Sequence, residues 1–261
     1  MPAKIYLTVY TVRRDFEADP MGTLEKIKAM GYEGVEIDLN FTEELFNAVK
    51  AKLKELELPA IGAHVGMDDM MDRTDFFLGR MKQLGMKYLG IPWLQTDCVP
   101  GGDRYAETKA KIRYMAERCR IEGITYHYHN HDFEFVKIGG VCKQDILLQD
   151  VPEVLTQLDV GWCAFAGQDP AAYIRHYGHR MPVLHLKDFT VNAGIDPNLS
   201  REERGFRFQP VGMGQVDFPA VFQAADEVGV VWMGVEQDES VERPALDAAR
   251  LSLEYIRKTY K

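Results

Sequence analysis

One pattern repeats eight times along the chain: a short extended segment is followed by a stretch with the spacing of an amphipathic helix. In the segment GVEIDL at 34–39, apolar residues alternate with Glu36 and Asp38, which is typical of a strand with one apolar face. The stretch at 104–121 has apolar residues at three- and four-residue steps and stops before Gly123, as a helix does. The segments that we expect to be strands are 5–12, 34–39, 59–66, 88–94, 124–135, 154–162, 183–189 and 230–238.

This alternation predicts an α/β fold with a parallel sheet, because the connections between the strands are too long for antiparallel hairpins. The count of eight strands predicts that the sheet closes, and a length of 261 residues suits one such barrel of about 250 residues. No low-complexity tract or linker divides the sequence. We therefore expect a single (β/α)8 TIM barrel, with residues 1–261 as its one domain.

The overall charge and the cysteines limit the classes of partner and the compartment. The formal net charge is -9, which disfavours generic binding to nucleic acid because the phosphate backbone is itself negative. Four scattered cysteines without a CxxC pair indicate reduced thiols in a cytoplasmic protein. The N-terminus lacks the features of a signal peptide, and no apolar run approaches the roughly 18 residues of a membrane span. We expect neither nucleic-acid nor membrane partners, and association into a homo-oligomer stays open.

The most unusual strand is ITYHYHNHDFEF at 124–135. Successive side chains of a strand point to opposite faces, so His127, His129 and His131 share one face. The opposite face is apolar or aromatic, and a carboxylate, Glu134, follows just beyond the strand. One histidine alone is most often a hydrogen-bonded structural residue, but three on one face indicate a site, since histidine is the commonest metal ligand and titrates near neutral pH.

Polar residues also gather on one face of the other expected strands. In a closed barrel this face points into the lumen, and the carboxyl ends of the strands form the active site. Buried charges are unfavourable unless they are paired, protonated or bound to a cation. A metal satisfies carboxylates and imidazoles together, so we expect one divalent metal ion with oxygen and nitrogen ligands: Mn, Mg, Co or Zn. The residues on this face or at these ends are Glu36, Asp38, His64, His127, His129, His131, Asp159, His185, Lys187, Glu236 and Asp238.

Several motifs, most of them on the late strands, resemble those of a known family. They are YHNHDFEF, LDVGW followed by AGQDP, HLKDF, PVGMG and VEQD, and together they resemble the sugar phosphate isomerase/epimerase group of xylose-isomerase-like TIM barrels. The resemblance implies a divalent metal held by Glu, Asp, His and Glu from strands five, six, seven and eight. Asp159, His185 and Glu236 fit the last three of these positions.

The metal ligand from strand five is open between two interpretations. The family's preference for a carboxylate favours Glu134, whereas the alternation alone favours His129 or His131. We expect Glu134 to be the ligand, with the two histidines beside it binding the substrate or orienting the ligands.

The resemblance implies an isomerase or epimerase that acts next to the carbonyl of a sugar or keto-sugar. The metal stabilises an enediolate, and by analogy with the family's epimerases Glu134 and Glu236 transfer the proton. Lys187 is expected either to stabilise a developing negative oxygen or to form a salt bridge in the lumen with Asp159 or Glu236.

Other activities occur on related barrels. An inosose-type dehydratase or a keto-glycoside lyase, acting on a cyclitol or a sugar, would use the same metal site. A non-catalytic barrel subunit of a larger complex would be expected to have lost the metal motif, which is intact in this sequence. A zinc nuclease of the abasic-site endonuclease type needs a basic DNA groove, which the net charge of -9 disfavours.

Three further residues are candidates for substrate binding. His64 comes near the end of the strand at 59–66, where it either binds sugar hydroxyls or caps the strand. Trp93 and Trp162 offer flat apolar surfaces to a sugar ring or simply form walls. The PVGMG segment at 210–214 lacks the pattern of a phosphate loop, and we expect the arginine-containing connection before it to cover the site.

Overall fold

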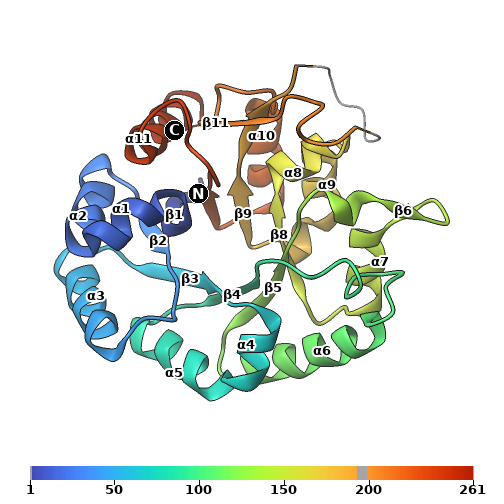
Figure 1. Ribbon diagram of the computed structural model, residues 1–261, viewed down its shortest axis with the longest axis horizontal. Coiled ribbons are helices and arrows are strands. Elements are labelled where there is room, and N and C mark those ends of the chain that lie inside the picture. The colour runs from blue at the N-terminus through green and yellow to red at the C-terminus, as the bar shows by residue number, and fades with distance from the viewer. Residues whose placement is uncertain (1, 193–198, 261) are drawn as a thin grey trace.

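The computed structural model describes residues 2–192 and 199–260, and it shows a closed barrel of parallel strands ringed by helices (Figure 1). The strands follow one another around the ring in the order β1-β12-β9-β8-β5-β4-β3-β2, and β2 pairs with β1 to close it. The predicted α/β class and (β/α)8 TIM barrel are confirmed. The strands of the barrel are β1 (Lys4–Thr8), β2 (Gly34–Glu36), β3 (Ala60–His64), β4 (Tyr88–Ile91), β5 (Thr125–His129), β8 (Leu155–Asp159), β9 (Val183–Leu186) and β12 (Trp232–Val235).

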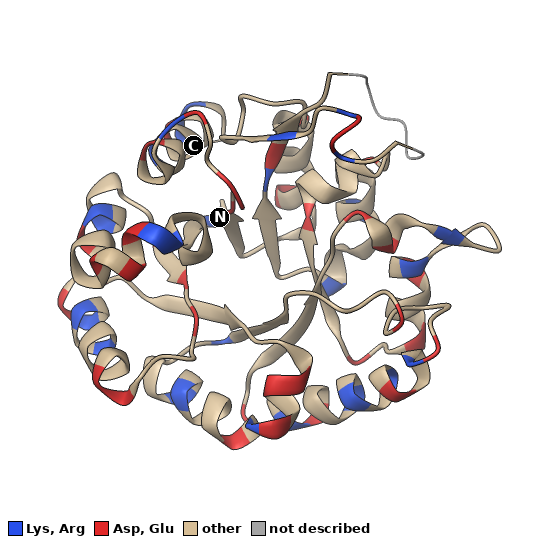
Figure 2. Ribbon diagram, viewed as in Figure 1, with Lys and Arg blue, Asp and Glu red and all other residues tan. Residues whose placement is uncertain are grey.

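Helices connect the strands and cover the outside of the barrel, and Figure 2 shows acidic and basic residues spread over them. Local sequence fixes several of their ends. The Thr42 side chain accepts the Leu45 amide and begins α3, and Gly31 ends α2 in the left-handed conformation with a φ of 94°. The helices are α1 (Arg13–Ala18), α2 (Pro20–Met30), α3 (Glu43–Glu55), α4 (Met67–Asp72), α5 (Thr74–Leu84), α6 (Tyr105–Ile121), α7 (Lys143–Asp150), α8 (Val160–Phe165), α9 (Pro170–Tyr177), α10 (Phe218–Val228) and α11 (Ala245–Thr259), with short 3-10 helices η1 (Val9–Val12), η2 (Phe133–Phe135) and η3 (Gly178–Arg180).

All eight barrel strands end earlier than the sequence predicts, and two of these early ends, those of β8 and β5, bear on the site. β8 stops at Asp159 and not at Trp162, because the Asp159 side chain accepts the Trp162 amide at 2.8 Å and begins α8. β5 stops at His129, and the chain then turns into η2. These two stops decide which residues reach the mouth of the barrel.

Two small antiparallel hairpins follow strands of the barrel. β6 (Lys137–Ile138) pairs with β7 (Val141–Cys142), and Figure 1 shows this hairpin projecting from the ring. β10 (Asp188–Thr190) pairs with β11 (Arg207–Gln209), which brings the long connection after β9 back to the end of that strand. Residues 193–198 of this connection lie outside the described residues.

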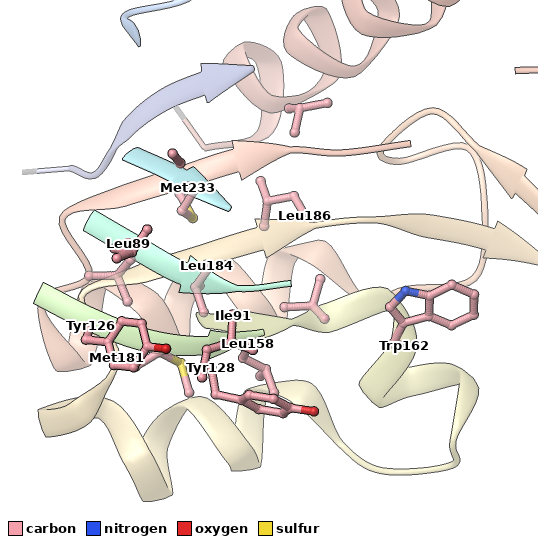
Figure 3. Close-up of a cluster of buried hydrophobic side chains, with 14 of the residues drawn as sticks. Leu89, Ile91, Tyr126, Tyr128, Leu158, Trp162, Met181, Leu184, Leu186 and Met233 are labelled. Atoms are coloured by element: carbon pink, nitrogen blue, oxygen red, sulfur yellow. The ribbon is translucent and has the colours of Figure 1, made fainter. Parts of the chain in front are cut away.

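The apolar face of each barrel strand packs against the surrounding helices, as the alternation predicts. Figure 3 shows part of this layer, with Leu89, Leu158, Leu184 and Met233 among its buried side chains. Burying a side chain of this size contributes roughly 1.5–3 kcal/mol, so the layer fixes the strands and hence the positions of the residues on their opposite face. Within the described ranges, no helix is both long enough and apolar enough to cross a bilayer.

Candidate active site

Four residues from different strands meet at the carboxyl ends of β5, β8, β9 and β12. They are His129, Asp159, His185 and Glu236, and each offers one ligand atom that lies within 4.8 Å of the others. All four side chains are buried. His129 and Asp159 end their strands, and Glu236 directly follows β12, so the parallel register of the barrel brings these residues to one level. We call this group the four-residue cluster.

The distances inside the four-residue cluster are close to those around a shared cation. His129 Nε2 lies 4.0 Å from both Asp159 Oδ2 and Glu236 Oε2. His185 Nδ1 lies 3.0 Å from Glu236 Oε2. Two ligand atoms that are each about 2.1 Å from one ion lie at most about 4.2 Å apart. The cluster therefore needs only small side-chain movements to hold such an ion.

Lys187 places its ammonium group beside the acidic members of the cluster. Its Nζ lies 3.3 Å from Asp159 Oδ2, 2.9 Å from Glu236 Oε2 and 2.8 Å from Asp238 Oδ1, and the side chain is buried. Burial alone would lower the pKa of Lys187, but the three carboxylates outweigh burial and raise it. The amine is therefore charged at neutral pH, and the salt bridges that were one of its two expected roles are present.

A hydrogen-bonded network on the lumen side holds His185 in place. Glu36 Oε1 lies 3.3 Å from His185 Nε2, while Nδ1 of the same ring faces Glu236. Thr8 Oγ1 donates to Glu36 Oε1 at 3.2 Å, and Gln157 Nε2 donates to Glu36 Oε2 at 3.2 Å. Carboxylates in such positions orient metal-binding histidines and raise their basicity.

Sequence reasoning assigned no chemical role to Gln157 or Tyr6, which both belong to this network. Gln157 Nε2 also donates to the Tyr6 hydroxyl at 3.0 Å, and Gln157 Oε1 lies 2.6 Å from His64 Nε2. Alternation already places Gln157 on the same face as Asp159, two residues earlier. That signal identifies the face of the strand but not the contacts that the side chain makes there.

Negative charge exceeds positive charge around the cluster. Burial, with a contribution from nearby Glu236, raises the pKa of Asp159 to about 6 despite the opposing effect of Lys187. Burial opposes the charged form of His185, but Glu236 and Glu36 outweigh it and raise the pKa of this imidazole to about 10. A divalent cation would balance the excess, and His185 would lose its proton when it binds the ion. The charged groups are the carboxylates of Glu36, Asp159, Glu236 and Asp238 and the cations Lys187 and protonated His185.

The donor atoms of the cluster fit a divalent metal ion. Asp159 Oδ2 is buried and lies 3.3 Å from Lys187 Nζ, yet among the described residues it accepts no hydrogen bond. Two imidazoles and two carboxylates, with no thiolate, form a mixed nitrogen and oxygen set that suits Mn, Co or Zn and, less well, Mg. The residues therefore fit the ion expected from the sequence, and their chemistry does not select one metal.

Glu134, the expected ligand from strand five, is not part of the cluster. Its carboxylate accepts hydrogen bonds from the Tyr128 hydroxyl and, at 2.9 Å, from the His131 amide. Tyr128 lies on the face of β5 opposite to His129, so the turn after β5 carries Glu134 away from the lumen. Burial raises the pKa of Glu134 to about 7. The structure thus places His129, the alternative ligand from strand five, in the four-residue cluster and Glu134 outside it.

A cavity of about 590 Å³ opens onto the cluster. Trp162, expected to bind substrate, does not line it. This side chain is only 1% exposed, because Phe206 stacks on it at 5.3 Å and the Arg201 guanidinium covers it at 4.2 Å. Trp162 is therefore a buried packing residue that lies under the long connection after β9. The predicted residues that do line the cavity are Glu36, Asp38, His64, Trp93, His129, His131, Lys187, Glu236 and Asp238.

The PVGMG segment at 210–214 is held by Asp188, which belongs to the HLKDF motif. Asp188 Oδ2 accepts the amides of Gly212 at 3.0 Å and Gly214 at 2.8 Å, and Oδ1 accepts that of Gln215 at 3.0 Å. Gly212 has a φ of 85°, a conformation that favours glycine. The two motifs thus form one structural unit beside the end of β9.

Curated relatives match part of this chain. An inosose dehydratase from Clostridium beijerinckii is 25% identical over 157 residues, which are 56% of this chain and 52% of the relative. An inosose dehydratase from Geobacillus kaustophilus is 28% identical over 155 residues, which are 56% of this chain and 49% of the relative. The chain thus spans about half the length of the curated relatives that it matches.

Solved structures resemble the barrel over nearly its whole length. A sugar phosphate isomerase/epimerase from Parabacteroides distasonis has a TM-score of 0.81 at 21% identity, with 99% of this chain and 100% of that chain covered. A 3-keto-D-glucoside 4-epimerase from E. coli has a TM-score of 0.71 at 19% identity, with 98% and 99% covered. At these identities the likeness shows the fold alone. The xylose isomerase-like TIM barrel family matches residues 24–259, and the chain therefore belongs to that family.

Proposed function

We propose that this protein is a divalent-metal-dependent isomerase or epimerase that moves a proton at a carbon next to the carbonyl of a sugar or keto-sugar. The observation that carries the proposal is the four-residue cluster, whose ligand atoms lie within 4.8 Å of one another beside a charged lysine and facing a cavity of about 590 Å³. Cavities of this size with a few convergent polar groups are typical of small-molecule sites.

The four cluster residues would hold the ion. When bound there, a divalent cation would act as a Lewis acid that polarises a substrate carbonyl and makes the adjacent C–H more acidic. Glu36 keeps His185 oriented toward the cluster through their 3.3 Å contact. Lys187 supplies a second, fixed positive charge at the cavity and can stabilise negative charge on a substrate oxygen.

Proton transfer falls to residues that line the cavity. Burial would raise the pKa of Glu236, but Lys187 and His185 hold it well below its usual range, so this group is a carboxylate at neutral pH and can accept a proton. Burial, together with Lys187, lowers the pKa of His131 to about 3, so this side chain is a neutral imidazole, and its Nδ1 has no hydrogen-bond partner among the described residues. In this proposal His131 takes the second proton-transfer role, which the sequence had suggested for Glu134.

The same arrangement supports an elimination, as in an inosose-type dehydratase or a keto-glycoside lyase. With Glu134 outside the lumen, the cavity offers a carboxylate base, Glu236, beside the protonated Lys187 instead of a pair of glutamates. A base next to a cation suits removal of a proton followed by departure of a neighbouring oxygen. The matching relatives named inosose dehydratases support this alternative. The intact ligand set argues against a non-catalytic barrel subunit.

Turnover in deuterium oxide distinguishes these reactions. The protein is stripped with a chelator, reconstituted with Mg²⁺, Mn²⁺, Co²⁺ or Zn²⁺, and incubated with ketohexoses, 3-keto-glucosides and inosose, and the products are analysed by NMR after removal of the ion. An isomerase or epimerase gives a product with deuterium next to the carbonyl, whereas a dehydratase or lyase gives an unsaturated or cleaved product.

Two variants connect this turnover to the cluster. E236Q should lose turnover, while E134Q, which changes a buried glutamate outside the cluster, should keep it. Undiminished turnover by the chelated protein, or wild-type rates in E236Q, would contradict the proposal.

A further inference from the structure

The cavity that opens onto the cluster has more room than one sugar ring needs. Its volume is about 590 Å³. A water molecule takes about 30 Å³ in the liquid, so a hexose of about 12 non-hydrogen atoms takes at most about 360 Å³, because bonded atoms pack more closely than separate molecules. The difference, at least about 230 Å³, leaves room for further ligand atoms bonded to the reacting ring.

Aromatic side chains line the part of this cavity that is formed by loops beyond the strand ends. Tyr10 comes from η1 after β1, and Trp93 comes from the loop after β4; they are 52% and 47% exposed. Phe41, after β2, lines the same cavity and stacks on Phe16 at a ring distance of 5.8 Å. We call Tyr10, Phe41 and Trp93 the aromatic rim. Single exposed aromatic residues are ordinary, but several that line one cavity indicate a surface that binds a ligand.

Hydrogen-bonding groups accompany the aromatic rim. Arg13, Glu17 and Asp38 line the same cavity. The Arg13 guanidinium lies 4.2 Å from the centre of the Tyr10 ring and donates to the Tyr10 carbonyl at 2.9 Å, which holds the ring in place. The Asn40 amide donates to Asp38 Oδ1 at 2.8 Å and fixes that carboxylate. Flat apolar faces next to such groups suit a sugar ring, which has C–H faces and hydroxyl edges.

The charges at the aromatic rim favour an uncharged ligand. Glu17 and Asp38 bring two negative charges, and the one positive group among these three side chains, Arg13, already contacts Tyr10. A phosphate placed there would be repelled by both carboxylates.

We infer that the natural substrate carries a second, uncharged sugar ring, linked to the reacting sugar and lying on the aromatic rim. The substrate class is then a glycoside of two sugar rings, not a free or phosphorylated monosaccharide. The inference rests on the proposed function for the reacting ring, but binding alone tests it.

Titration with unreactive sugars provides the test. Glucose, cellobiose, maltose, phenyl β-glucoside and glucose 6-phosphate are titrated into the wild-type protein in the presence of Mg²⁺, and affinities are measured by calorimetry. At least one disaccharide should bind about tenfold more tightly than glucose. An aromatic contact contributes about 0.5–1.5 kcal/mol, so Y10A and W93A should each weaken disaccharide binding about 2- to 10-fold and leave glucose binding unchanged.

Tyr114 offers a matched control. It is 46% exposed and also lies beside an arginine, Arg118 at 5.9 Å, but it belongs to α6 and does not line the cavity. Y114A should therefore leave every affinity unchanged.

Several outcomes would overturn the inference. Equal affinities for glucose and both disaccharides, or no binding of any sugar, would do so. Binding of phenyl β-glucoside or glucose 6-phosphate as tight as that of the disaccharides would exclude an uncharged sugar ring as the specific occupant. If disaccharides bind more tightly than glucose but no substrate is turned over, the result would count against the proposed function and would still support the site for a second ring.

Discussion

Replacing Lys187 by methionine removes one positive charge from between three carboxylates and keeps most of the side-chain volume. Lys187 Nζ lies 2.8 Å from Asp238, 2.9 Å from Glu236 and 3.3 Å from Asp159, and the residue is 1% exposed. Leaving buried charges without their partner costs about 3–5 kcal/mol. In a chain of this size each kcal/mol shifts Tm by about 2–4 °C, so Tm of metal-free K187M should fall by about 6–20 °C.

A divalent ion should restore part of this loss. K187M has one more uncompensated negative charge than the wild type, so Mg²⁺ or Mn²⁺ should bind it more tightly and raise its Tm further. Circular dichroism melting curves of both proteins, with EDTA and with millimolar ion, measure the difference.

Lys52 provides the control for this experiment, because its Nζ also contacts two carboxylates, Glu25 at 3.0 Å and Glu55 at 2.9 Å, on the surface. K52M should therefore melt almost like the wild type. If K187M also melts like the wild type, or if divalent ions stabilise the wild type more than K187M, the buried-charge interpretation of the site is wrong.

Three other substitutions test separate parts of the structure. Burial raises the pKa of Glu134 from about 4.5 to about 7. The protonated side chain therefore contributes fully to stability below about pH 4.5, and roughly 3 kcal/mol of the free energy of unfolding is lost as the pH rises through 7. Urea unfolding at about pH 5 and about pH 8 should show this loss in the wild type and not in E134Q. E36Q removes the charge that faces His185 Nε2 and should weaken Mn²⁺ binding about 10- to 100-fold in calorimetry, whereas an unchanged affinity would refute the orienting role of Glu36. D188N replaces an acceptor oxygen, which faces the amides of the PVGMG segment, by an NH2 group. The free energy of unfolding should fall by about 1–3 kcal/mol, and amide hydrogen exchange at 212–216 should become faster. Unchanged exchange would contradict the role given to Asp188.

The barrel and most of the cluster could be predicted from the sequence because strand alternation has a strict period of two. That period assigned Asp159, His185 and Glu236 to the lumen, and the rule that barrel sites lie at strand carboxyl ends brought them together. Strand alternation does not predict the position of the Glu134 side chain. The alternation holds only while the chain is extended, and β5 ends at His129, so the turn before η2 decides the direction of Glu134.

Trp162 and Gln157 show two further limits. Trp162 was expected on an extended strand, but helix α8 begins directly after Asp159 and places its ring under Phe206. Gln157 was on the correct face, yet its hydrogen bonds depend on Glu36, which is far away in the sequence. The cytoplasmic location and the divalent metal ion stay predictions, and association into a homo-oligomer stays open.

Metal binding by three proteins tests the central claim most directly. Metal-stripped wild type, D159N and E134Q are titrated with Mn²⁺, and free ion is followed by electron paramagnetic resonance. We predict one tightly bound ion per chain in the wild type and in E134Q, and binding at least about 10- to 100-fold weaker in D159N. A wild-type chain that binds no divalent ion, or loss of the ion in E134Q with retention in D159N, would contradict the assignment of the site to His129, Asp159, His185 and Glu236.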